Sequence, residues 1–81
     1  MKINRVALDL AKNLIQVHAV DAAGRVAVRK PLRRAQLLSF FRDLVPCEVG
    51  MEACASAHHW GRQLQAMGHC VQLLPPQYVK P

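Results

Sequence analysis

The sequence predicts a single α/β domain built on a mixed five-stranded sheet, and three observations lead to this prediction. Apolar runs of strand length fill about the first thirty residues and are separated by short turns. From about residue 33 the apolar residues recur at helical spacing. Two further short apolar runs then alternate with helical segments, which is typical of parallel strands joined by crossovers.

The first half of the chain has the pattern of an antiparallel meander. Residues 6–10 are apolar apart from Asp9, as expected for a central strand covered on both faces. A hairpin turn is expected at residues 21–24, because Gly24 accepts a positive φ. The next segment alternates polar and apolar residues in part, which predicts a strand at the edge of the sheet.

The second half has the pattern of two crossovers. An amphipathic helix is expected between Pro31 and Pro46. Ser56 is the expected N-cap of a second helix, and Gly68 has the position of a glycine just after a helix end. The expected strands cover about residues 2–10, 14–20, 25–30, 47–51 and 70–74, and the expected helices about 33–44 and 57–67.

Right-handed crossovers place these strands in the order 3-2-1-4-5, counted along the chain. The first and fourth strands are then neighbours. Asp9 lies near the end of the first and Glu52 just past the end of the fourth, so we expect their carboxylates to converge at one edge of the sheet.

Length and charge narrow the class of protein. A chain of 81 residues forms at most one domain and buries only about 60% of its unfolded surface. The formal net charge of +6 favours a polyanion such as nucleic acid, although a solvated basic face is equally consistent with it. The candidate nucleic-acid-binding residues are Lys12, Arg29, Lys30, Arg33 and Arg34.

The compartment predicted is the bacterial cytoplasm, with no membrane partner. The sequence contains no secretory apolar segment and no apolar run near 18 residues. Cys47, Cys54 and Cys70 form no Cys-x-x-Cys pair, and we expect reduced thiols.

The two embedded acids point to a metal. Neighbouring carboxylates repel each other unless a cation lies between them, and hard oxygen ligands suit Mg²⁺ or Mn²⁺. Such ions activate the attacking oxygen in phosphodiester chemistry. The alternative is structural: Asp9 bonded to backbone or to Lys12, and Glu52 a solvated acid at a helix entry.

The cysteine, histidine and tryptophan residues indicate a function less specifically than the two acids. Cys54 and His58 have helical spacing, but no four ligands match a zinc pattern. His58 and His59 are candidate groups for orienting the metal ligands, with a helix surface as the alternative for the histidines. Trp60 is expected in the core, with base stacking as the alternative.

Three segments together resemble a known family. Residues 8–12, LDLAK, are similar to its first-strand motif; residues 51–60, MEACASAHHW, are similar to its second acidic motif; and residues 73–81, LLPPQYVKP, are similar to the segment before its third. The family is the DEDD transposases of bacterial insertion sequences, whose N-terminal domain is RuvC-like, with an RNase H fold.

The resemblance implies a truncated RNase H-like domain that cleaves and joins DNA with Mg²⁺ held by four acids. Asp9 and Glu52 match the first two. It also implies a guiding bridge RNA and a downstream domain with a nucleophilic serine. Ala7 stands where the family has glycine, and the last two acids would follow Pro81, since Asp21 and Asp43 lie in the wrong elements.

The chain is therefore expected to be the N-terminal part of such an enzyme, to bind metal weakly and to be inactive alone. Without a helix covering the fifth strand, Val71, Leu73 and Leu74 would leave apolar surface and a strand edge exposed, so we expect a homo-oligomer. The alternative function is a basic nucleic-acid-binding or oligomerising module without catalysis.

Overall fold

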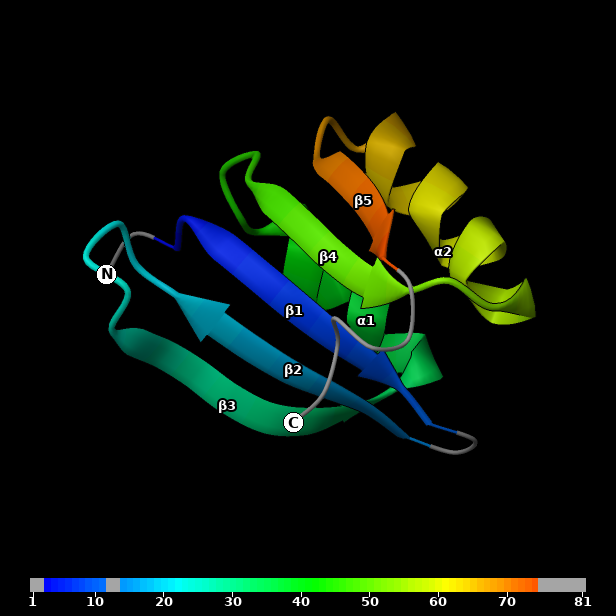
Figure 1. The fold of residues 1–81 in the computed structure, drawn as a ribbon, viewed down its shortest axis with the longest axis horizontal. Coiled ribbons are helices and arrows are strands. Elements are labelled where there is room, and N and C mark those ends of the chain that lie inside the picture. The colour runs from blue at the N-terminus through cyan, green and yellow to red at the C-terminus, as the bar shows by residue number, and fades with distance from the viewer. Residues whose placement is uncertain (1–2, 12–13, 75–81) are drawn as a thin grey trace.

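The computed structural model describes residues 3–11 and 14–74 and shows a sheet with two helices packed against it (Figure 1). The elements in chain order are β1 (Arg5–Leu10), β2 (Leu14–Val20), β3 (Val26–Arg33), α1 (Arg34–Arg42), β4 (Glu48–Glu52), α2 (Ala55–Ala66) and β5 (Cys70–Leu74). The predicted sequence of strands and helices is thus confirmed.

The sheet has the predicted order, β3-β2-β1-β4-β5. β2 pairs antiparallel with β1 and with β3, while β4 is parallel to both β1 and β5. The hairpin turn before β3 also forms as expected: Gly24 has a φ of +83°, and the Asp21 side chain accepts the backbone N–H groups of Ala23 and Arg25 at 2.9 Å.

Both helices pack on one face of the sheet, and their buried residues form one core with the strands. Val6 and Leu8 of β1 point into this core, whereas Arg5, Ala7 and Asp9 are exposed. The expectation that the first strand is covered on both faces is therefore wrong for the described residues. Its apolar appearance comes partly from Ala7, a small residue on the other face, which we call the open face.

The boundary between β3 and α1 differs from the prediction. β3 continues through Pro31, which pairs with Gln16, and ends at Arg33. Because β3 is an edge strand, its outer side has no neighbouring strand. Proline, which has no N–H to donate, is therefore tolerated there. α1 then begins at Arg34, with the Gln36 side chain accepting the Arg33 N–H at 2.9 Å.

The start of α2 also differs, while its end is as predicted. Cys54 is the N-cap, and Ser56 lies inside the first turn, 3.5 Å from the Cys54 sulfur through its Oγ. Gly68 follows the helix with a φ of +96°, the left-handed conformation expected after a helix end.

A buried histidine joins three elements. His69 is 4% exposed, and its Nδ1 accepts the Cys47 N–H at 3.1 Å. Nδ1 is therefore unprotonated, and Nε2 donates to the Phe41 carbonyl at 3.2 Å. The suggestion that the histidines lie on a helix surface is wrong for His69.

Cys47 lies beside this histidine, with its sulfur 3.6 Å from Nδ1. Burial, assisted by the charge of Glu48, raises the pKa of the Cys47 thiol. It is thus a packing residue, in contrast to Cys54 and Cys70, which are exposed. Neither described helix is long and apolar enough to span a bilayer.

Candidate functional site

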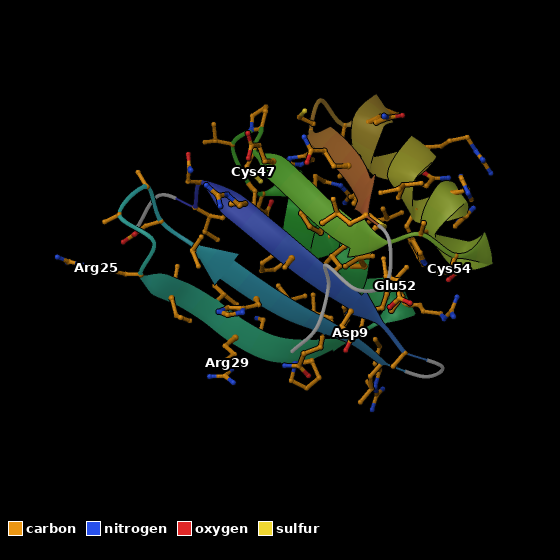
Figure 2. All side chains as sticks on the ribbon, in the orientation of Figure 1. Asp9, Arg25, Arg29, Cys47, Glu52 and Cys54 are labelled. Atoms are coloured by element: carbon orange, nitrogen blue, oxygen red, sulfur yellow. The ribbon has the colours of Figure 1, made fainter. Side chains whose placement is uncertain are left out.

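Asp9 and Glu52 lie at the same end of the neighbouring parallel strands β1 and β4. In the parallel pair β1–β4, Leu8 is opposite Met51, and both are fully buried. Continuing this register by one residue places Asp9 opposite Glu52, and both side chains project from the opposite face because strand residues alternate. Figure 2 shows the two acids at the same end of the two strands.

The two acids start from adjacent backbone positions if the register of β1 and β4 continues past Leu8 and Met51. Neighbouring strands lie about 4.8 Å apart, so side chains at opposite positions reach a common ion. Asp9 is exposed and Glu52 is half-buried, which leaves their oxygens accessible. The two acids thus lie at one edge of the sheet, and the convergence of their carboxylates stays a prediction.

No internal partner neutralises this pair within residues 3–11 and 14–74. The ion pair recorded there is on the same face but at the other end of the strands, between Arg5 and Glu48 at 3.6 Å. Asp9 and Glu52 accept no hydrogen bond from a described residue. Lys12, the cation proposed as a structural partner of Asp9, lies outside the described residues.

The two acids carry oxygen atoms of the kind that divalent metal ions bind. Carboxylate oxygens fit Mg²⁺ or Mn²⁺, but Mg²⁺ requires near-octahedral coordination. Among the described residues, no group of three or more His, Cys, Asp or Glu side chains is arranged to hold a metal. The remaining ligands would come from water, substrate or residues beyond this part of the chain.

A hollow of about 460 Å³ lies farther along the open face. Its floor includes Ala7 and Gly50, which are paired in the β1–β4 register, and its walls include His18 and Gln72. Neither Asp9 nor Glu52 lines it. The hollow is therefore a separate feature of the open face.

The predicted basic cluster is divided between two faces of β3. Arg29 pairs with His18 and Arg33 with Leu14, so both arginines lie on the open face. Lys30 lies on the helix-covered face, with its Nζ 5.6 Å from the centre of the Phe40 ring. Arg34 opens α1, and Lys12 is outside the described residues. Figure 2 shows Arg25 and Arg29 projecting outward at the β3 edge.

The aromatic and histidine residues of α2 separate into core and surface. Trp60 is 7% exposed and belongs to the core, as predicted, and its Nε1 has no partner among the described residues. His58 and His59 are exposed, and the ring of His59 packs against Trp60 with 5.0 Å between centroids. The structure records no contact of either histidine with Asp9 or Glu52, and their role near the acids stays a prediction.

Comparison with known proteins identifies the relatives of this chain. It is 54% identical over 81 residues to a probable family 20 transposase of Pseudomonas aeruginosa, and the alignment covers 100% of the chain and 24% of that protein. The chain matches a segment of insertion-sequence transposases.

Two other relatives agree. Identity is 38% over 79 residues with the transposase for insertion sequence element IS1328 of Yersinia enterocolitica, covering 98% of the chain and 24% of the relative. Identity is 39% over 79 residues with the transposase for insertion sequence element IS1111A of Coxiella burnetii, covering 98% of the chain and 22% of the relative. The chain thus spans about a quarter of the length of these transposases. No protein-family model matches it, and no solved structure does.

Proposed function

We propose that the chain forms the first part of the catalytic domain of a metal-dependent DNA transposase, in which Asp9 and Glu52 bind Mg²⁺ or Mn²⁺. The observation that supports this most directly is the register of the parallel strands β1 and β4, because its continuation past Leu8 and Met51 would place Asp9 opposite Glu52. The similarity to transposases makes DNA the expected substrate. The strand order, β3-β2-β1-β4-β5, is the one expected of an RNase H-like (RuvC-like) domain.

In this proposal Asp9 and Glu52 hold the metal ion and orient it toward the DNA. Their negative charges repel each other at the end of β1 and β4, and a bound cation removes that repulsion. Mg²⁺, when bound, activates an attacking oxygen and stabilises a leaving oxygen of a phosphodiester. Further acids from a longer polypeptide would complete the DEDD set, so this chain alone would bind metal weakly and be inactive. A bridge RNA and a nucleophilic serine elsewhere in the protein belong to the same proposal.

Removal of metal tests the catalytic proposal. A protein of the relatives' length that contains this chain should cleave and join its DNA ends in Mg²⁺ or Mn²⁺ and lose this activity to background in a chelator. Activity should return when Mg²⁺ is added in excess over the chelator, which controls for damage by the chelator itself. Undiminished cleavage in the chelator would rule out the proposed role of Asp9 and Glu52.

A second function, nucleic-acid binding without catalysis, is favoured by the two arginines on the open face. Arg29 and Arg33 are four residues apart along β3 and project from one face. Each phosphate contact contributes about 0.9 to the slope of log affinity against log salt for duplex DNA. We expect the double change Arg29→Gln and Arg33→Gln to reduce the magnitude of that slope by about two. Fluorescence anisotropy of labelled duplex DNA at several salt concentrations measures it.

The matched control for this measurement is Arg42→Gln, an exposed arginine in the last turn of α1. It should leave the slope unchanged. Binding that survives Asp9→Asn and Glu52→Gln would favour the non-catalytic function, and a slope unaffected by the double change would exclude Arg29 and Arg33 as contacts.

A further inference from the structure

The two edges of the sheet differ in their protection against strand pairing. β3 carries Arg29, Lys30 and Pro31, and its pairing with β2 contains a register shift. Charges, proline and bulges prevent another strand from adding to an edge. β5 reads CVQLL and has no charged residue, no proline and an unbroken register with β4. The β5 edge is therefore open to pairing.

The free hydrogen-bonding groups of β5 belong to Val71 and Leu73. Cys70 donates its N–H to Cys47 at 3.0 Å, and the Leu74 carbonyl accepts the Ala53 N–H at 2.8 Å. Since successive strand residues direct their backbone groups to opposite sides, those of Val71 and Leu73 point away from β4. Within the described part of the chain, β5 pairs with β4 alone.

A groove of about 230 Å³ runs beside this edge, between α2 and β5. It is lined by His58, Gly61, Arg62, Gln65, Val71 and Leu73. Gly61 allows α2 to approach closely, because a Cβ added there would lie 3.5 Å from Val71 Cγ1. The lining contains one arginine and one histidine and no acid, so it suits a segment with negative side chains.

We propose that this groove binds an extended peptide segment with acidic side chains, which adds to β5 as a sixth strand. Its backbone would pair with the free N–H and C=O groups of Val71 and Leu73, and its acidic side chains would face Arg62 and His58. This inference goes beyond the proposed transposase function and does not depend on it.

Two other occupants fit the groove less well. The phosphates of a nucleic acid would meet Arg62 but offer no donor to the carbonyls of Val71 and Leu73. A second copy paired edge to edge would bring its own α2 toward the same space, because α2 extends beyond β5 in Figure 1. It would also place basic groups opposite basic groups.

The test is an NMR titration of the ¹⁵N-labelled chain with two peptides of about seven residues, one alternating threonine and glutamate and the other threonine and lysine. We expect the glutamate peptide to shift the amide signals of Val71 and Leu73 and to bind about fivefold more tightly than the lysine peptide. The glutamate peptide N-methylated at every residue should lose binding, because it cannot donate to the strand edge.

In the variant Arg62→Glu, the lysine peptide should bind about fivefold more tightly than the glutamate peptide. Arg42→Glu, which makes the same charge change on α1, should leave the order unchanged. Equal binding of both peptides, equal effects of both variants, or shifts away from Val71 and Leu73 would overturn the proposal. So would concentration-dependent shifts of these two amides without peptide, which would indicate a second copy, or tighter binding of a single-stranded DNA probe at the same amides.

Discussion

Glu52→Gln, in a protein of the relatives' length, is expected to lower the rate of DNA cleavage by about 10³-fold. Glutamine keeps the shape of the side chain and removes the charge that would help to hold the cation. The measurement is single-turnover cleavage of a labelled transposon end in Mg²⁺. The fold should be unaffected, because Glu52 is not in the core.

Glu48→Gln is the matched control for this substitution. Glu48 is on the same strand and projects from the same face, but it lies at the other end of β4, beside Arg5. It should retain cleavage within about threefold of the unmodified protein, since exposed ion pairs contribute little. Equal losses in the two variants would show that the effect comes from the charge of the open face and not from the acid opposite Asp9.

The largest loss of stability is expected from His69→Leu. Leucine fills a similar volume but leaves the Cys47 N–H without its partner. The Phe41 carbonyl loses the bond from His69 but keeps the one from the Leu44 N–H at 3.2 Å. An unpaired buried donor costs about 1–3 kcal/mol, so the free energy of unfolding should fall by about 1–3 kcal/mol. A domain of this size is stable by only about 4–12 kcal/mol, so the loss is a large share of the total.

Urea unfolding followed by circular dichroism measures this effect. The control is His18→Leu, because His18 is exposed on β2 and makes none of the hydrogen bonds found for His69. Its change in stability should stay within about 0.5 kcal/mol. A His69→Leu protein as stable as the His18→Leu protein would show that the buried histidine does not hold α1, β4 and β5 together.

The position of Asp9 and Glu52 at the same end of neighbouring strands was predictable because it follows from strand order. Once the first and fourth strands are parallel neighbours, acids near their carboxyl ends must lie at one edge of the sheet. The short turn at residues 21–24 was equally readable, because its aspartate and glycine act locally.

Features that depend on contacts between distant residues could not be predicted from the sequence. His69 is held in the core by hydrogen bonds with Cys47 and Phe41, which lie 22 and 28 residues away in the sequence. Its position directly after Gly68 and before a strand was the available signal, and it does not specify those partners. Pro31 fits both a helix entry and an edge strand, so the end of β3 was placed too early. The open face was missed because an apolar run does not reveal on which side the helices pack.

Titration of Mn²⁺ into the ¹⁵N-labelled chain tests whether Asp9 and Glu52 share a metal ion, since this paramagnetic ion broadens the NMR signals of nearby amides. We expect amides around Asp9 and Glu52 to broaden first. Glu52→Gln should abolish this broadening, and Glu48→Gln should not. Broadening centred on Asp21 or Asp43, or unchanged by Glu52→Gln, would contradict the assignment of Asp9 and Glu52 as a shared metal site.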